Sequence, residues 1–187
     1  FCFVLGGGWR RSRQAADSAR SANADLILAA VAIRQLASRD ARAVPDEIAE
    51  ICERAGIETG TVYQKLEWLG KQRLIDGAAD CRTPHQRFAS VVLNSILEGQ
   101  GKAGREKVAT MIEGVMLDPR FPYAGLQVLI HELRFGSRDY SWTRLLGQEG
   151  VEAAVARCWV AEGSDRGFAA LALSDLWDFA EGGAAAV

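Results

Sequence analysis

The sequence predicts an all-α protein, with a small amino-terminal group of helices followed by a larger carboxy-terminal helical bundle. Two observations predict this fold. Apolar residues recur at intervals of three and four along most of the 187 residues, which is the spacing of a helix face. Residues 51–63 read as the end of one short helix, a turn that contains a glycine, and the start of a second short helix. We therefore expect a helix-turn-helix in the amino-terminal group.

The elements before this motif are an arm and a scaffold helix. Residues 1–20 are expected to be a flexible arm, with a three-glycine run as a joint, since the glycine spacing does not fit a dinucleotide-binding loop. Residues 26–36 are apolar or alanine at most positions and predict a buried helix. Pro45 then opens the next helix, at a position where its missing N–H is not needed. Residues 21–76 form the predicted helix-turn-helix domain.

The turn and the second helix of the motif carry the candidate DNA contacts. Gly56 stands where the first helix must stop and the chain needs a left-handed residue. Val62 and Leu66, four residues apart, are expected to face the core, while Tyr63 keeps its hydroxyl free for a phosphate oxygen. Helical spacing continues over residues 68–75. Outward-facing hydroxyl, amide and ammonium groups can bond base edges or phosphates. The predicted DNA-contacting residues are Thr59, Gly60, Thr61, Tyr63, Gln64, Lys65 and Lys71.

The run from Ala55 to Tyr63, Ala-Gly-Ile-x-x-Gly-Thr-Val-Tyr, resembles the helix-turn-helix core of TetR-type transcriptional regulators. Residues 11–34 resemble the basic arm and first helix of that family, so the resemblance covers roughly the first third of the chain. In the family an aromatic residue and then a lysine follow the tyrosine; here Leu66 replaces the aromatic residue and the lysine comes later, at Lys71. The resemblance implies a ligand-responsive repressor that binds a pseudo-palindromic operator on double-stranded DNA as a dimer.

Two other interpretations stay open. Residues 60–75 also resemble the recognition helix of a winged helix-turn-helix, which ends in Gly-Leu-Ile before a β-hairpin, although residues 77–87 lack the alternating pattern of such a wing. The chain could instead be a helical interaction protein that has lost DNA binding, which the acidic helix before the turn would suit. Residues 1–75 carry 11 Lys and Arg against 9 Asp and Glu, and the remainder carries 11 against 15. The motif therefore lies in the more basic part, by a small margin.

Residues 77–187 are predicted to form a helical domain for ligand binding and dimerisation, after a polar, helix-breaking boundary at residues 77–84. Apolar spacing predicts helices over residues 86–97, 106–117, 123–135, 151–161 and 168–179, the last one ended by Gly182-Gly183. The final helix is apolar on more than one face and needs a second surface to cover it. In TetR-like proteins the last two helices form a four-helix dimer bundle, so the resemblance implies a homodimer through residues 151–179.

A small-molecule effector of unknown identity is expected among these later helices. Regulators of this type enclose a ligand between helices, and methionine and aromatic side chains supply adaptable apolar surface for it. The candidate ligand-binding residues are Met111, Phe121, Tyr123, His131, Trp142 and Trp159.

Catalytic and metal sites are not predicted. His131-Glu132 begins like the zinc motif His-Glu-x-x-His, but Phe135 stands at the second histidine position. No serine elbow or phosphate-binding loop occurs, so we expect no enzyme activity, no catalytic residues and no cofactor. The four cysteines lie far apart and predict neither a zinc site nor a disulfide, which favours a cytoplasmic protein. No apolar run reaches the roughly 18 residues needed to cross a bilayer, so no membrane association is expected.

Overall fold

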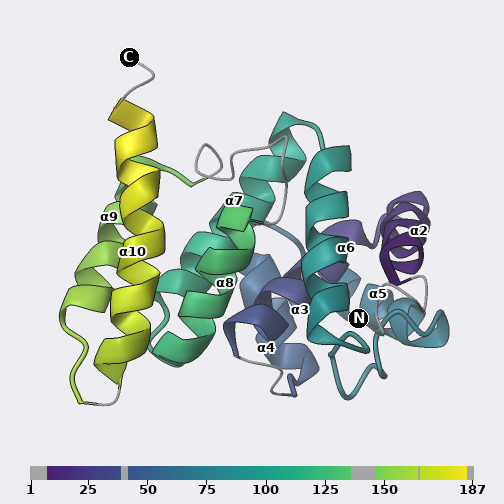
Figure 1. Cartoon of the computed structure of the whole chain (residues 1–187). Helices are drawn as coiled ribbons and strands as arrows, with labels where there is room; N and C mark the ends of the chain where they lie inside the picture. Colours follow the sequence, from purple (N-terminus) through teal and green to yellow (C-terminus); the bar gives the residue numbers. More distant parts are fainter. Residues whose placement is uncertain (1–7, 39–41, 136–145, 164, 185–187) are drawn as a thin grey trace.

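Every regular element in the described part of the chain is an α-helix, which confirms the all-α prediction for that part. The structure is a computed structural model that describes residues 8–38, 42–135, 146–163 and 165–184, with the backbone alone at positions 9, 134, 135, 148 and 177–184. The helices, labelled in Figure 1, are α2 (Gly8–Ser21), α3 (Asp25–Ala37), α4 (Pro45–Arg54), α5 (Thr59–Lys71), α6 (Gln86–Gly99), α7 (Lys102–Leu117), α8 (Tyr123–Phe135), α9 (Gln148–Trp159) and α10 (Asp165–Ala184).

Helix α3 lies at the centre of the fold (Figure 1). It contacts α2, α4 and α5 as well as α6, α7 and α8. All of its residues except Leu26 are buried, and alanines at positions 29, 30 and 32 let neighbouring helices approach closely. A helix that is apolar around most of its circumference is expected to be buried in this way. The scaffold helix predicted over residues 26–36 is therefore confirmed.

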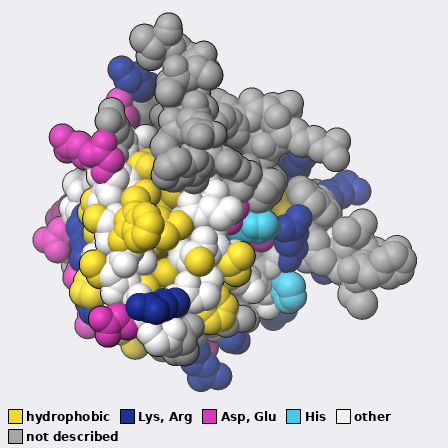
Figure 2. All heavy atoms as spheres, turned by 60° about the vertical axis from the view of Figure 1, so that its left-hand side comes forward, with side chains coloured by type: hydrophobic (Ala, Val, Ile, Leu, Met, Phe, Trp, Pro, Cys, Tyr) yellow, Lys and Arg dark blue, Asp and Glu magenta, His cyan; other side chains and the backbone are white. Residues whose placement is uncertain are grey.

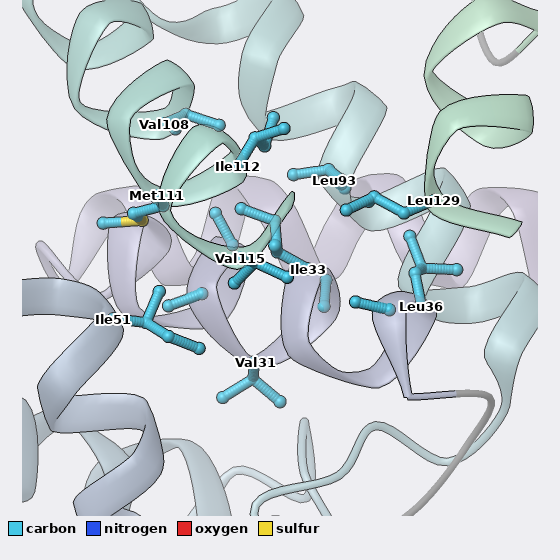
Figure 3. Packing of buried hydrophobic residues seen from close by; sticks show 14 of the residues in the cluster. Val31, Ile33, Leu36, Ile51, Leu93, Val108, Met111, Ile112, Val115 and Leu129 are labelled. Atoms are coloured by element: carbon cyan, nitrogen blue, oxygen red, sulfur yellow. The ribbon is translucent and has the colours of Figure 1, made fainter. Parts of the chain in front are cut away.

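The hydrophobic core is continuous from α2 to α10. Its centre lies around α3, where Val31, Ile33 and Leu36 meet side chains from α4, α6, α7 and α8 (Figure 3). The boundary expected at residues 77–84 does separate α5 from α6 along the chain, since these residues are not helical. It does not separate two cores, because α3 supplies buried side chains to both groups of helices.

The flexible arm predicted over residues 1–20 is wrong for residues 8–20, which lie in helix α2. One face of α2 consists of small side chains, Ser12, Ala15, Ala16 and Ala19, which are buried where α2 packs against α6. Small residues spaced three and four apart give a helix a smooth stripe against which a second helix packs closely. The arginines of this segment suggested an arm, but the alanine stripe decides its structure.

Two helix ends differ from the prediction. Helix α5 ends at Lys71, because Arg73 adopts a left-handed conformation (φ 56°) and turns the chain. A non-glycine residue in this conformation costs on the order of 1 kcal/mol, which burial of Ile75 just beyond the turn offsets. Helix α10 runs through Gly182-Gly183, the pair at which the sequence predicts its end. Glycine weakens a helix by about 1 kcal/mol per residue but does not by itself terminate it.

After α5 the chain turns back and lies beside the segment that precedes α4. The backbone N–H of Asp76 donates to the Arg82 carbonyl at 2.7 Å, and the Arg82 guanidinium bonds the Asp76 carboxylate at 3.0 and 3.1 Å. The backbone N–H of Cys81 donates to the Ala43 carbonyl at 3.0 Å. Three non-helical segments, one before the helix-turn-helix and two after it, are therefore joined by backbone hydrogen bonds.

Gln35 of α3 anchors the end of this returning segment. Its side-chain carbonyl accepts from the backbone N–H of Thr83 at 2.8 Å and from the Thr83 hydroxyl at 2.7 Å. Its amide donates to the Thr83 carbonyl at 3.3 Å. Both residues are buried, so these bonds replace contacts with water that folding removes.

Replacing Gln35 by Leu should lower the free energy of unfolding by about 2 kcal/mol, because the buried N–H and hydroxyl of Thr83 lose their acceptor. Denaturant unfolding followed by circular dichroism measures this change. Gln14→Leu, at an exposed position of α2, is the matched control and should change the free energy by no more than about 0.5 kcal/mol. Equal stability of the two variants would show that Gln35 is not an anchor.

Candidate functional site

The candidate site is built on α4 and α5, which are joined by residues 55–58. Gly56 has a φ of 69°, so the left-handed residue predicted at this helix end is confirmed. The backbone N–H groups of Gly56 and Ile57 bond carbonyls of the last turn of α4 at 2.9 and 3.1 Å. An L side chain at position 56 would be strained at this φ. The glycine turn therefore fixes where α5 begins.

Helix α5 packs against α3 and α4 through one face. Val62, Leu66 and Leu69 are buried along this face, with exposed fractions of 0 to 1%. The predicted inward orientation of Val62 and Leu66 is confirmed. The remaining residues of α5 are exposed or half-buried, so the helix presents a polar side to its surroundings.

The start of α4 is fixed by an ion pair with α3. Pro45 occupies the first turn of α4, as predicted. The Glu47 carboxylate accepts from the backbone N–H of Val44 at 3.2 Å and pairs with Arg34 Nη2 at 2.9 Å. The Arg34 side chain is 10% exposed, so this pair lies at the edge of the core. The start of α4 is thereby held to the central helix α3.

The predicted DNA-contacting residues lie at different depths on α5. Gly60, Tyr63, Gln64 and Lys71 are exposed, whereas Thr59, Thr61 and Lys65 are half-buried. The Gln64 side chain makes no hydrogen bond to any described residue, so its amide is available to a base edge. Lys71 pairs with Glu67 at 2.8 Å on the exposed side of the helix. Surface pairs of this kind contribute little to stability and exchange readily.

Two side chains that were expected to face outward freely are bonded within the chain. The Tyr63 hydroxyl donates to the Asp46 carboxylate at 2.5 Å, and this bond raises the pKa of Tyr63. Lys65 Nζ donates to the Ala22 carbonyl, just beyond the end of α2, at 2.7 Å. The expectation that Tyr63 has a free hydroxyl and that Lys65 points to solvent is therefore wrong. Both partners come from other helices or turns, which the pattern of α5 could not reveal.

A polar hollow of about 500 Å³ lies beside the start of α5. Thr61 lines it together with two cations, Arg20 and Lys107, and two carboxylates, Asp25 and Glu58. The opposing charges give the hollow no preference for one sign of ligand charge.

The predicted effector residues do not converge on one cavity. Met111 is fully buried in the core beside α3 (Figure 3). Trp159 is 73% exposed at the end of α9, and His131 of α8 is exposed with its Nδ1 3.5 Å from the Asp175 carboxylate. Trp142 lies outside the described residues. A methionine or aromatic residue at helical spacing fits a core as well as a ligand site, so the sequence could not separate the two.

Tyr123 and Phe121 both lie close to Arg157 of α9. The Tyr123 hydroxyl donates to the Arg157 carbonyl at 3.0 Å, and the Arg157 guanidinium lies 5.2 Å from the centre of the Tyr123 ring. The same guanidinium donates to the carbonyl of Met116 at 2.5 Å and to the carbonyl of Phe121. Arg157 therefore ties α9 to the connection between α7 and α8.

Phe121 also lines a cavity of about 230 Å³ between α3, α4 and the α7–α8 connection. Its charged lining residues are Arg34, Glu47, Glu50 and Arg120. None of these four is among the ligand-binding residues predicted from the sequence. They are separated by up to 86 positions along the chain and are brought together only by packing of α4 against the later helices.

Arg120 is the centre of an ion network at the rim of this cavity. Its Nη2 lies 2.8 Å from Glu50 and 2.6 Å from Asp118, and its Nε donates to Asp118 at 3.0 Å. Arg54 reaches both carboxylates at 3.3 Å and donates to the Gly114 carbonyl at 2.8 Å. The hydrogen bond from Arg120, followed by that from Arg54, holds the pKa of Asp118 at about 2. Arg120 likewise lowers the pKa of Glu50.

One contact of this ion network, between Asp118 and Arg120, joins residues that are close together in the sequence. The backbone N–H of Arg120 donates to the Asp118 carboxylate at 3.0 Å, the bond that an aspartate makes to the residue two positions on in a turn. The sequence predicts only that a helix ends at residue 117, just before this turn. Glu50 and Arg54 reach the turn from α4, and no spacing rule connects positions so far apart.

Comparison of the chain with models of protein families, with curated proteins and with solved structures finds no match. Among the described residues, no group of three His, Cys, Asp or Glu side chains is placed to hold a metal ion. None of the helices in the described ranges is both long and apolar enough to span a bilayer. Function is therefore inferred from the geometry of the described side chains.

The pKa of Asp118 predicts how stability changes in acid. The folded chain holds this carboxylate ionised down to about pH 2, whereas the unfolded chain binds the proton near pH 3.9. Its contribution, roughly 2 kcal/mol, is therefore present above pH 4 and is lost as the pH falls toward 2. Asp118→Asn should remove this contribution at pH 7 and flatten the free energy of unfolding between pH 4 and 2.

Denaturant unfolding at a series of pH values measures both effects. Asp17→Asn, on the exposed side of α2, serves as the control and should keep the acid dependence of the unaltered protein. If Asp118→Asn kept that dependence as well, the Arg120 and Arg54 network would not be what stabilises the carboxylate.

Proposed function

We propose that this chain is a sequence-specific DNA-binding transcriptional regulator with α5 as its recognition helix. The observation that carries the proposal is the pair α4 and α5, two helices joined by four residues, both packed on α3, with polar side chains exposed along α5. In a helix-turn-helix the second helix enters the major groove while the first crosses the backbone. The exposed amide of Gln64 then faces the bases, where glutamine bonds adenine through both polar atoms.

The segment after α5 bears on whether such a regulator has the TetR-like or the winged form. A winged helix-turn-helix follows its recognition helix with a β-hairpin. Here the chain after α5 folds back through the backbone bonds from Asp76 to Arg82 and from Cys81 to Ala43. Residues 77–80 form the tip of this return, but residues 72–85 contain no β-strand, so the hairpin of the winged form is absent from this segment. The motif that resembles TetR-type regulators is the helix-turn-helix itself, which both forms contain.

The alternative of a helical interaction protein without DNA binding also has an observation in its favour. Tyr63 and Lys65 already have partners within the chain, and Asp46 places a negative charge beside α5. A phosphate group would have to displace Asp46 from the Tyr63 hydroxyl. DNA binding by this chain consequently depends on Gln64, on Lys71 after release from Glu67, and on the backbone at the start of α5.

A homodimer belongs to the proposal because apolar side chains stay exposed on α9 and α10. Trp159 is 73% exposed, Val160 72% and Leu171 55%. Figure 2 shows hydrophobic side chains gathered on the face of the molecule to which these helices belong. Apolar groups of this size are usually covered by a partner. A second copy, joined through about residues 151–179, would also place two recognition helices about 34 Å apart on successive major grooves.

Gln64→Ala should weaken binding to the chain's preferred DNA by roughly tenfold, because a base contact of this type contributes about 1 to 3 kcal/mol. The preferred DNA is obtained by sequencing fragments that are recovered with the protein from a random pool. Fluorescence anisotropy then compares one recovered fragment with a shuffled fragment at several salt concentrations, and wild-type affinity should fall as salt rises.

The matched control for this variant is Gln127→Ala on α8, a helix that is not part of the helix-turn-helix. It should bind the recovered fragment as the wild type does. Absence of any preference by the wild type for recovered over shuffled DNA would reject the regulator and support the interaction protein.

Leu171→Glu should shift the protein from dimer to monomer, because a charge at this exposed apolar position would be desolvated in the interface. Light scattering after size-exclusion chromatography measures the mass. Leu117→Glu alters an exposed leucine of α7 and should leave the dimer intact. A wild-type protein that is monomeric at every concentration tested would disprove the dimer.

A further inference from the structure

The cavity beside Arg120 has the size of a small organic molecule. Its volume of about 230 Å³ is below the roughly 300 to 1,000 Å³ that encloses a drug-sized ligand. A molecule of about ten non-hydrogen atoms fits such a space. The cavity lies where α4, the first helix of the helix-turn-helix, meets the α7–α8 connection, so an occupant touches both.

The lining combines an apolar wall with guanidinium groups. Ile51, Phe121 and Pro122 supply the apolar part. Arg34 lies in the interior with its guanidinium 5.8 Å from the centre of the Phe121 ring, and Arg120 lies at the rim with its side chain 59% exposed. A planar apolar ring between Phe121 and Pro122 leaves a polar substituent of the ligand within reach of the Arg120 side chain.

The two carboxylates that line the cavity differ in how firmly they are held. Glu47 is fixed by Arg34 and by the backbone N–H of Val44. Glu50 is 44% exposed; it bonds Arg120 through Nη2 alone and Arg54, one turn along α4, at 3.3 Å. A contact between two exposed ions across a gap is the one that an incoming anion displaces most easily.

The Arg120 guanidinium is positioned to exchange Glu50 for the carboxylate of a ligand. Asp118, 6% exposed, occupies one edge of the guanidinium through Nε and Nη2 and keeps the side chain in place. Arg120 Nη1 bonds no described residue. A guanidinium held on one edge and open on another binds a planar carboxylate through two parallel N–H groups.

We propose that this cavity binds a small aromatic carboxylate, whose ring packs on Phe121, Ile51 and Pro122 and whose carboxylate replaces Glu50 on Arg120. Such a ligand carries one negative charge on a planar aromatic ring. The site differs from the ligand region that the sequence suggested, since it contains Phe121 but not Met111, Tyr123, His131 or Trp159.

Displacement of Glu50 has a consequence for α4. The Glu50–Arg120 contact is one of the bonds that hold α4 to the α7–α8 connection, together with those of Arg54. A ligand that favours the arrangement without the Glu50–Arg120 contact shifts the position of α4. Because α5 is joined to α4, its orientation toward DNA changes as well. This step rests on the proposed function, whereas binding of the carboxylate does not.

The test uses the full chain without DNA and benzoate as the probe. Isothermal titration should give one site per chain with a Kd on the order of 0.1 to 1 mM, as expected for so small a ligand. Benzamide, the neutral molecule of the same shape, should bind at least tenfold more weakly because it lacks the charge that Arg120 selects.

Glu50→Gln supplies the decisive variant, because it removes the competing carboxylate and keeps the size of the side chain. Benzoate should bind this variant about fivefold more tightly. Glu53→Gln, an exposed change on the same helix outside the cavity, should leave the Kd unchanged. Arg120→Lys should weaken benzoate binding roughly tenfold, since an ammonium group lacks the two parallel N–H groups of a guanidinium. Circular dichroism should show that this variant is folded.

The inference is overturned if benzoate does not bind, if benzamide binds equally well, or if Glu50→Gln leaves benzoate binding unchanged or weaker. Its failure is distinguishable from that of the proposed function. Benzoate binding by a chain that prefers no DNA sequence would reject the regulator and keep the site. DNA binding by a chain that ignores benzoate would reject the site and keep the regulator.

Discussion

Burial of α3 on nearly all sides is the constraint on which the rest of the structure depends. Because this helix is apolar around its circumference, it must be covered by several neighbours at once. The helices α4 and α5 cover part of it, and α6, α7 and α8 cover the remainder. One helix therefore serves as the base of the α4–α5 pair and as the centre of the larger bundle. A shift in the later helices would reach α4 and α5 through this shared core, since packed interiors transmit strain.

The connection between α7 and α8 is the second meeting point of the two parts. On one side, Arg54 and Glu50 of α4 bond Asp118 and Arg120. On the other, Arg157 of α9 donates to the Phe121 carbonyl of the same connection and to the Met116 carbonyl in the last turn of α7. Helix α4 and helix α9 therefore both bond this short segment or the residues beside it. This arrangement gives a physical route between the proposed dimer surface, the cavity and the proposed recognition helix, without requiring contact between the first and the last.

The surface of α5 is less basic than that of many DNA-binding helices. Asp46 of α4 lies beside it, Glu67 of α5 itself pairs with Lys71, and Lys65 donates to the Ala22 carbonyl. Phosphate attraction alone would then supply little affinity, because that term depends on how many cations face the duplex. Recognition by this helix would depend more on base contacts and on the partner copy than on charge. The folded-back segment after α5 adds a second element at the same edge of the molecule.

The sequence by itself determined the features that depend on neighbours in the chain. Helical spacing gave α3 and the later helices, Pro45 the start of α4, and Gly56 the turn, because each follows from local backbone geometry. The inward positions of Val62 and Leu66 followed from the same periodicity. Residues 8–20 carry a local helical signal as well, because their small side chains recur at intervals of three and four.

Only the tertiary structure decided which side chains meet across the fold. The partners of Tyr63 and Lys65 lie 17 and 43 positions away, and Glu50 and Arg120 are 70 positions apart. Whether Met111 fills the core or lines a site likewise depends on which helix covers it. Sequence spacing reports the face of a helix on which a residue lies but not the surface opposite that face. That surface is set by how all the helices pack together around α3, which no single segment encodes.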